Sequence, residues 1–350
     1  MKIIILASTT NLKHAAGMDR VIYNAKEACN KEFELVVYLS ANNFHNFCKG
    51  VVKILINNPF SFSFIIFNAL SSVRSKSISF WKMYYCLSWI FRIKRVFYWH
   101  EMPEYYANFS KKFSSDSKSI EYFFKNKKTI QLSCSELSKE TALFFDDKPN
   151  VTNINNCIIP RTLNKNILLS KFTVITIASI QEIKGTDIWT DVAIKVCQQN
   201  KDIQFIWCGG IVNNQMFVEC LRKIKEAKLE EQIIFMGKVE DAAVLASTAH
   251  LYYCSSRLDS FPLAVLEAMN HGKNIIYYNS GGVMEAVGEN GFFIPNFLIE
   301  NTVDAILKKH QEFLTNPNTV FNKEVYDKFY NNYTPEIFAK KLKVALERNN

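Results

Sequence analysis

Short apolar runs alternate with longer amphipathic stretches along the chain, and this alternation restricts the fold more than any other feature. Such a pattern is typical of βα units around a parallel sheet. In the first half it predicts strands at Lys2–Leu6, Glu34–Leu39, Val51–Ile56, Arg95–Trp99 and Thr129–Ser133. After residues 153–160 the pattern restarts and predicts strands at Phe172–Ser179, Ile203–Cys208, Gln232–Met236, His250–Cys254 and Asn274–Tyr278. Helices are expected between them, among them Asp187–Gln199 and Asn213–Ala227.

Two consecutive βα series predict two domains. A chain of 350 residues also exceeds the ~250–300 residues that one hydrophobic core usually serves. We therefore expect an α/β protein with two Rossmann-like, doubly wound domains that face a cleft. The expected bounds are 1–162 and 163–334, with an amphipathic helix over Pro335–Arg348 at the end of the chain.

Cysteine usage and hydropathy favour the cytoplasm. The nine cysteines are scattered and include no Cys-x-x-Cys pair, which suits a reducing compartment better than a disulfide framework or a zinc site. The five-residue apolar run near the start is shorter than a signal-peptide core. No apolar stretch approaches the ~20 residues that span a bilayer.

Charge is unevenly distributed between the two halves. The chain carries a net charge of +9, which admits nucleic acid or an anionic membrane as a partner. Residues 1–160 hold 21 basic against 12 acidic side chains, whereas residues 161–350 hold 21 of each. The whole excess therefore belongs to the first domain.

The densest group of chemically informative residues lies in residues 255–287 of the neutral half. Asp259 follows a predicted strand, Pro262 suits a first helical turn, and Glu267 falls more than one turn inside that helix. Free N–H groups at a helix start can hold an anion or a sugar hydroxyl. Gly281 and Gly282 follow the next strand and let the backbone approach a ligand closely.

These residues resemble the signature of the retaining glycosyltransferases of family four, which have the two-domain GT-B fold. The signature E-G-F-G/P-L-x-x-x-E-A-M followed by G-G-x-x-E is matched by DSFPLAVLEAM from Asp259 and by GGVME from Gly281. Weaker matches to the family's other motifs occur in the family's order at AAGMDRV, WHE, CSELSKE, INNCI and ASIQEIKGTD. The resemblance implies that the last helix returns to the first domain.

The resemblance also implies a nucleotide-sugar site in the second domain. Glu267 is expected to accept hydrogen bonds from the donor ribose. Asp259 would contact hydroxyls of the transferred sugar, together with the N–H groups near Phe261 and Leu263. Lys184 would stabilise the charge that grows on the diphosphate as the glycosidic bond breaks.

Two further residues are expected to come from the first domain. Gly17 would let the first loop approach the diphosphate or the acceptor, and His100 would lie over the sugar or help to orient the acceptor. The fold generally works without a divalent ion, and no Asp-x-Asp motif stands out, so no metal is expected. Individually, several of these residues also have ordinary interpretations: a loop lysine at Lys184, a strand-end histidine at His100 and a helix-start acid at Glu285.

Two departures from the family pattern affect the expected site. Asp259 is one methylene shorter than the usual Glu, which bears on sugar preference. Ser179 occupies the position of an Arg that normally joins Lys184 at the phosphates. Either Lys184 and helix dipoles suffice, or another cation such as Arg257 or Arg161 substitutes.

The acceptor side is expected to be basic and aromatic. Residues 79–95 carry Trp and Tyr at helical spacing beside Lys and Arg, which fits either a core helix or an interfacial helix. Lysines at positions 111, 112, 125, 127 and 128 lie nearby in sequence. A membrane-facing basic patch would suit a lipid-linked glycan or lipopolysaccharide acceptor at the inner leaflet.

The sequence therefore predicts a metal-independent retaining glycosyltransferase of surface-polysaccharide synthesis, such as that of lipopolysaccharide, O-antigen or capsule. It would use a nucleotide-diphosphate sugar and a glycan or lipid-linked acceptor, in the cytoplasm or on the inner face of the membrane. An epimerase or phosphorylase on the same fold is the alternative. A nucleic-acid-binding protein is a remote one, because the basic residues form no recognition motif. A Rossmann dehydrogenase is disfavoured, since no G-x-G-x-x-G follows the first strand.

Overall fold

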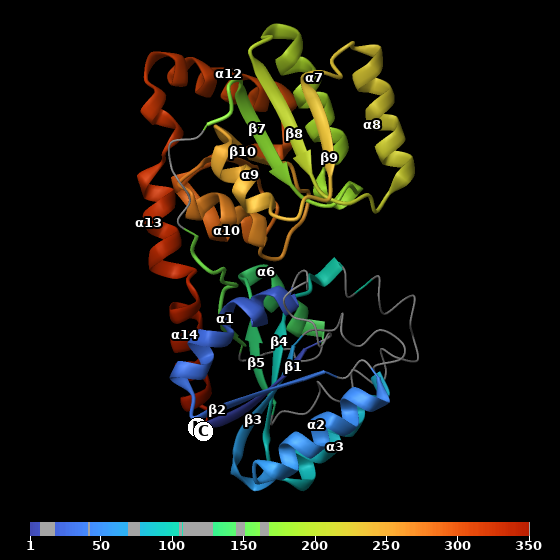
Figure 1. Cartoon of the computed structure of the whole chain (residues 1–350), viewed down its shortest axis with the longest axis vertical. Helices are drawn as coiled ribbons and strands as arrows, with labels where there is room; N and C mark the ends of the chain where they lie inside the picture. The colour runs from blue at the N-terminus through green and yellow to red at the C-terminus, as the bar shows by residue number, and fades with distance from the viewer. Residues whose placement is uncertain are drawn as a thin grey trace. The chain divides into compact units, whose positions relative to one another are not determined.

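The computed structural model describes residues 1–7, 18–40, 43–68, 78–104, 107, 129–144, 151–161 and 168–349. The chain divides into two compact units (Figure 1). Unit 1 comprises Met1–Ile159 together with Tyr333–Asn350, and unit 2 comprises Pro160–Asn332. The two consecutive βα series predicted from the sequence correspond to the sheets of these two units.

Unit 1 is built on a six-stranded parallel sheet in the order β2-β1-β3-β4-β5-β6. The strands are β1 (Lys2–Ala7), β2 (Leu35–Ser40), β3 (Phe62–Asn68), β4 (Lys94–Trp99), β5 (Ile130–Ser133) and β6 (Val151–Asn153). Its described helices are α1 (Met18–Glu32), α2 (Phe44–Ile56), η2 (Pro59–Ser61), α3 (Ile78–Ile90), α6 (Glu136–Glu140), η4 (Thr141–Phe144) and α14 (Pro335–Glu347).

The strand predicted at Val51–Ile56 is wrong, because these residues form the last turns of α2. The Asn43 side chain accepts a hydrogen bond from the N–H of Asn46 and caps the helix start. Phe47, Gly50 and Ile54 are buried at three- and four-residue spacing, which is a helical period. The third strand of the sheet order is instead β3, in a stretch for which no strand was predicted.

Unit 2 is built on a second six-stranded parallel sheet, in the order β12-β11-β10-β7-β8-β9. The strands are β7 (Phe172–Ile177), β8 (Ile203–Cys208), β9 (Ile233–Gly237), β10 (Leu251–Cys254), β11 (Asn274–Tyr278) and β12 (Phe292–Ile294). The helices are η5 (Glu182–Lys184), α7 (Thr186–Gln199), α8 (Asn214–Glu226), α9 (Ala242–Thr248), α10 (Leu263–Asn270), α11 (Gly282–Val287), η6 (Gly288–Asn290), η7 (Pro295–Phe297), α12 (Ile299–Thr315), η8 (Pro317–Val320) and α13 (Lys323–Asn332).

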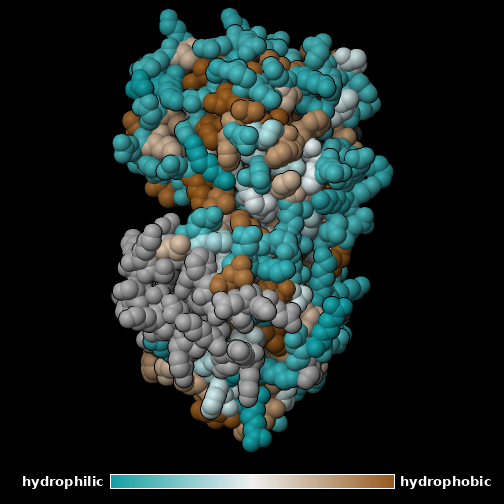
Figure 2. All heavy atoms as spheres, turned by 180° about the vertical axis from the view of Figure 1, so that it is seen from behind, coloured by the Kyte–Doolittle hydropathy of each residue, from teal (hydrophilic) through white to brown (hydrophobic). Residues whose placement is uncertain are grey.

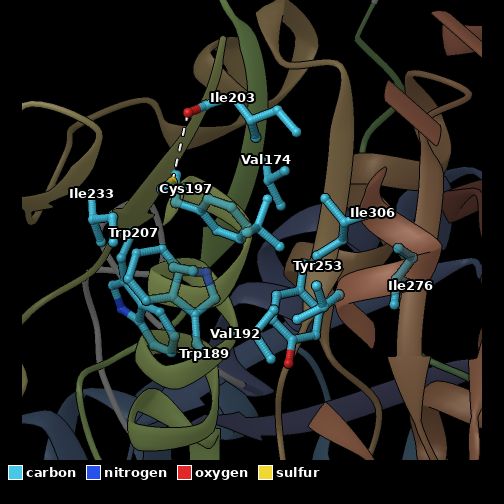
Figure 3. Packing of buried hydrophobic residues seen from close by; sticks show 14 of the residues in the cluster. Val174, Trp189, Val192, Cys197, Ile203, Trp207, Ile233, Tyr253, Ile276 and Ile306 are labelled. Atoms are coloured by element: carbon cyan, nitrogen blue, oxygen red, sulfur yellow. Dashed lines mark hydrogen bonds between the residues drawn. The ribbon is translucent and has the colours of Figure 1, made fainter. Parts of the chain in front are cut away.

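Aromatic side chains fill the core of unit 2 between the sheet and α7 (Figure 3). Trp189 on α7 is fully buried, and its ring packs edge-on against Trp207 of β8, with centroids 5.2 Å apart. The Trp207 indole N–H donates to the carbonyl of Ala178, 2.7 Å away, just beyond the end of β7. This bond fixes the start of the loop that follows β7.

The last helix completes unit 1. Buried side chains of α14, among them Phe338 and Leu342, face α1 and the sheet, where they line a small apolar cavity with Ile22 and Tyr98. The Ile158 N–H donates to the carbonyl of Tyr333, 3.2 Å away. The predicted return of the last helix to the first domain is therefore confirmed, and α14 is drawn red beside blue α1 in Figure 1.

Candidate functional site

The loops that leave the carboxyl ends of β7 and β10 in unit 2 are joined by an ion pair between Lys184 and Asp259. The two side chains are 23% and 12% exposed, so the pair is largely shielded but open to solvent on one side. Residues 75 positions apart thus meet at the edge of the sheet where ligands of open α/β sheets bind. Both residues were predicted site residues.

Lys184 is held by a tight turn. It ends η5, and the next residue, Gly185, adopts the left-handed conformation with φ 65° and ψ 35°. A Cβ atom at Gly185 would lie 2.0 Å from the carbonyl oxygen of Ser255, so only glycine fits. The Ser255 hydroxyl in turn donates to the Lys184 carbonyl at 2.9 Å. The two loops are therefore in direct backbone contact.

Arg257 strengthens this contact. Its guanidinium forms two parallel hydrogen bonds of 2.7 and 2.6 Å with the Asp187 carboxylate and a third, of 2.7 Å, with the Glu182 carbonyl. Its backbone N–H donates to the carbonyl of Ile183 at 2.9 Å. Burial alone would raise the pKa of Asp187, but the hydrogen bonds and charge of Arg257 outweigh it and lower that pKa. Arg257 thus ties together the residues on both sides of Lys184.

The glycine loop after β11 supports Asp259 from the other side. The Asp259 N–H donates to the Ser280 carbonyl, and the Gly282 N–H donates to the Asp259 carbonyl, each at 2.9 Å. A Cβ atom at Gly282 would lie 1.8 Å from the carbonyl oxygen of Ser260. The close approach at Gly282 is therefore to the neighbouring loop of the protein. Gly281 precedes α11 with φ 80°.

Glu267 lies in the second turn of α10, as predicted, and is half-buried. Phe261 is buried and Leu263 is half-buried at the helix start. Burial raises the pKa of Tyr252 well above its ordinary value, and the negative charges of Glu267 and Asp259 add to that shift. Both carboxylates therefore lie close enough to the Tyr252 hydroxyl of β10 to raise its pKa, so they lie near each other.

Lys184 remains a cation in this setting. Burial would lower its pKa, but the charge and hydrogen bond of Asp259 prevail and raise it. The site thus presents a protonated amine and a carboxylate that neutralise each other. The Lys184 ammonium is thus already in position to bind an anionic ligand. A small side-chain movement would release Lys184 from Asp259.

The two cations that could replace the Arg missing at Ser179 are both paired elsewhere. Arg257 holds Asp187, and Arg161 donates to both carboxylate oxygens of Asp241 at 2.6 and 2.5 Å. Ser179 is half-buried, and its hydroxyl accepts a hydrogen bond of 2.7 Å from the Gln181 side chain. Of the three cations, Lys184 alone is paired with a predicted sugar-binding residue, Asp259.

His100 lies in unit 1, just after β4, and is 5% exposed. Its ring centroid is 4.1 Å from that of Tyr98. Burial lowers the pKa of His100 to about 3, so the imidazole is neutral near pH 7. It can exchange hydrogen bonds there but carries no charge. Gly17 and the lysines at positions 111–128 lie outside the described residues.

The sequence did not single out Ser255 or the partnership of Arg257 with Asp187. Asp187 was recognised only as the last residue of a motif, although its position in the first turn of α7 is one that favours an acid. Within the described ranges, no three His, Cys, Asp or Glu side chains are grouped as they would be to hold a metal ion.

Residues 162–333 match the family model described as glycosyl transferases group 1. The matched segment nearly coincides with unit 2 and contains the Lys184–Asp259 pair, Glu267 and the glycine loop. The part of the candidate site in unit 2 therefore lies within a region that is similar to this family.

Curated relatives match about half of the chain. An uncharacterized glycosyltransferase of Haemophilus influenzae is 26% identical over 188 residues, which are 52% of this chain and 51% of the relative. A component of the phosphatidylinositol N-acetylglucosaminyltransferase of Arabidopsis thaliana is 22% identical over 178 residues, 50% of this chain and 38% of that protein. The chain thus spans about half or less of the length of these relatives.

Some solved structures match nearly the whole chain. HepE of Anabaena, solved with UDP and glucose, superposes with a TM-score of 0.73 at 15% identity and covers 99% of this chain and 100% of its own. The predicted fold class is therefore confirmed: two parallel six-stranded α/β units form a GT-B fold.

Proposed function

We propose that this protein is a glycosyltransferase that moves a sugar from a nucleotide-diphosphate sugar to a glycan or lipid-linked acceptor, with retention at the anomeric carbon. One observation carries the proposal: Lys184 and Asp259 meet at the carboxyl ends of β7 and β10 within the segment similar to group 1 glycosyl transferases. Binding of UDP and glucose by HepE, a protein of the same fold, supports a nucleotide-sugar donor.

In the proposed complex the donor replaces the internal ion pair. The diphosphate takes the Lys184 ammonium, and Asp259, released from it, accepts hydrogen bonds from hydroxyls of the sugar. N–H groups at Phe261 and Leu263 assist it, while Glu267 accepts hydrogen bonds from the ribose. Gly281 and Gly282 shape the loop that supports Asp259. One rearrangement of Lys184 therefore prepares both halves of the donor site.

Catalysis then rests on charge and position. The bond from the anomeric carbon to the diphosphate oxygen breaks, and the nucleoside diphosphate leaves with the electron pair. The acceptor hydroxyl attacks from the same face and gives its proton to the leaving diphosphate. Lys184 stabilises the negative charge that develops there, and we propose that no metal ion is needed. Addition of EDTA should then leave turnover unchanged.

The acceptor side is assigned to unit 1. Neutral His100 is proposed to orient the acceptor by hydrogen bonding, with Gly17 in the first loop close to the diphosphate. The excess of positive charge in residues 1–160 suits an acceptor linked to a lipid diphosphate or lipopolysaccharide. The lipid-directed name of the Arabidopsis relative is in keeping with this choice. The protein would then act in surface-polysaccharide synthesis at the inner face of a cell membrane.

The decisive experiment is a thermal-shift screen of nucleoside diphosphates and their sugars, because a ligand that binds only the native state raises its stability. Lys184→Ala and Glu267→Ala should each abolish most of the shift and of the turnover while the protein stays folded. Lys195→Ala is the matched control. It removes an exposed lysine of α7 that is paired with exposed Glu300 of α12. Full activity in either site variant would contradict the assignment.

The stereochemistry and the reaction class need a second measurement. Proton NMR of the product should show the anomeric configuration of the donor. Incubation of the donor without acceptor should give at most slow hydrolysis. Conversion of the donor into its epimer would instead identify an epimerase, and a requirement for inorganic phosphate would identify a phosphorylase.

A further inference from the structure

A stretch of unit 1 lacks acidic side chains altogether. Residues 35–100 contain no Asp or Glu and eight Lys or Arg. The stretch includes α2, η2 and α3; the charged side chains of α2 and α3 are all lysines, and η2 has none. Solvated helix faces in soluble proteins usually mix both signs, and a face of one sign attracts a partner of the other.

Helices α2 and α3 pack together through aromatic rings. Phe47 on α2 lies 4.9 Å from Tyr84 and 5.7 Å from Phe80 of α3, between ring centroids. Phe60 of η2 meets Phe91, just after α3, at 5.5 Å. The contact between Phe60 and Phe91 therefore brings η2, which follows the C-terminal turn of α2, to the C-terminal end of α3.

The outward side of this surface is apolar. On α3 the exposed positions are Met83, Cys86, Trp89 and Ile90, which recur at the spacing of one helix face. Trp89 is 67% exposed and Ile90 is 64% exposed. The exposed apolar residues of the second half of α2 and of η2 are Val52, Leu55, Ile56 and Phe60, among which Ile56 is 78% exposed. We call these eight residues the α2–α3 face.

The α2–α3 face is not the surface that the sequence suggested. Trp81, Tyr84 and Tyr85 are buried in the core of unit 1, and Arg95 is buried with its guanidinium 4.9 Å from the Tyr85 ring centroid. For these residues the core interpretation holds. Trp89 alone among the suggested Trp and Tyr residues of this helix is exposed, and α2 supplies apolar residues that the sequence did not connect with it.

Basic side chains border the apolar positions. Lys49 and Lys53 are exposed on α2, and Arg92 is exposed directly after α3. In Figure 2 brown and tan residues lie among hydrophilic ones at the lower end of unit 1, the end at which Figure 1 labels α2 and α3. An apolar face that includes Trp and is bordered by Lys and Arg has the composition of a surface that lies in a membrane interface.

We propose that the α2–α3 face docks unit 1 on an anionic lipid bilayer. Apolar side chains enter the boundary between head groups and acyl chains, and Lys49, Lys53 and Arg92 meet the lipid phosphates. A second copy of the chain fits the face less well, because pairing it with itself would bring like charges together. Of the helices that the structure describes, none combines the length and apolarity needed to cross a bilayer.

Vesicle sedimentation tests the proposal. The full chain is mixed with vesicles of phosphatidylcholine alone or with 30% phosphatidylglycerol (about a third anionic lipid, where electrostatic attraction is strong). Trp89→Glu and Ile56→Glu place a carboxylate on the face at positions where no core packing is lost. Leu314→Glu is the matched control, because Leu314 is 60% exposed on α12 in unit 2.

The expected result is binding to anionic vesicles that falls at least about tenfold in each face variant and stays unchanged in the Leu314→Glu control. Raising the salt from 0.1 to 1 M, which shortens the Debye length from about 10 to about 3 Å, should weaken binding severalfold. Absence of binding, or equal binding by all variants, would overturn the proposal. So would a dimer in sedimentation velocity without lipid that the same substitutions dissociate.

Membrane docking is inferred independently of the proposed function. Only the purpose of docking, access to a lipid-linked acceptor, rests on that function. Nucleotide-induced thermal shifts, measured on the same variants, keep the two apart. If Trp89→Glu and Ile56→Glu lose vesicle binding but retain the nucleotide-induced thermal shift, docking is supported and is shown to be separate from donor binding. A chain that docks without any nucleotide-induced shift would keep the surface and reject the glycosyltransferase assignment.

Discussion

Gly185 allows a stringent test of how the candidate site is built. Replacing it with Ala introduces a Cβ atom 2.0 Å from the Ser255 carbonyl oxygen, in a residue with φ 65°. Gly237→Ala is the matched control, because Gly237 has φ 69° and open space where its Cβ would lie. The two variants share the conformational cost and differ in the clash.

The expected magnitudes follow from that difference. A left-handed Ala costs about 1–2 kcal/mol, partly offset by a stiffer unfolded chain, so Gly237→Ala should lose about 1 kcal/mol. In Gly185→Ala the β10 loop must also move away. The hydrogen bonds from Ser255 to Lys184 and from Arg257 to Ile183 would be broken. At about 0.5–1.5 kcal/mol for each bond, the total loss becomes about 2–4 kcal/mol.

Native-state hydrogen exchange, read on peptides from β7 and α7, measures this loss in unit 2 separately from unit 1. Titration with UDP on the same samples reports the site. Gly185→Ala should also weaken nucleotide binding, since it displaces the turn that holds Lys184. Equal destabilisation by the two substitutions would refute the idea that contact between the loops requires glycine here.

Three further outcomes are expected. In a double-mutant cycle, Arg257→Ala and Asp187→Ala should couple by only about 1 kcal/mol in stability, because the side chains are 34% and 39% exposed, yet each should raise the donor KM. Burial lowers the pKa of Lys273 to about 8 from its ordinary 10.5. Between pH 8 and pH 10.5 the unfolded chain therefore binds more protons than the folded one, and the contribution of Lys273 to stability rises with pH. Lys273→Met should therefore raise the free energy of unfolding, relative to the natural chain, by more at pH 7 than at pH 10. Urea unfolding at the two pH values measures this difference. Trp189→Ala, at a fully buried ring, should cost about 3–5 kcal/mol in urea unfolding, against about 0.5 or less for exposed Val218→Ala.

Five of the six strands of unit 2 could be predicted to within about two residues, because strands buried on both faces read as continuous apolar runs. The three-residue edge strand β12 was not predicted. The run from Val51 to Ile56 misled for the same reason: six apolar or basic residues do not distinguish a strand from the end of a helix. Asn43, the helix cap, was the available signal. No strand was predicted at Phe62–Asn68, although this run of seven residues is largely apolar.

The predicted positions of Lys184, Asp259 and Glu267 on their loops and helix agree with the structure, since each follows from local chain order. Their contacts could not be predicted, because the ion pair joins residues 75 apart and depends on how β7 and β10 are paired. Arg257 shows the limit most clearly. The sequence made Arg257 a candidate to bind the donor phosphates, whereas in the structure its guanidinium binds the Asp187 carboxylate.

The return of α14 to unit 1 affects how the protein is made. Unit 2 is one continuous segment and can fold as soon as Asn332 has left the ribosome, although it is encoded second. Unit 1 waits for its last helix, because α14 covers α1 and buries Phe338 and Leu342. During synthesis the unit that carries the α2–α3 face is therefore the last to be completed.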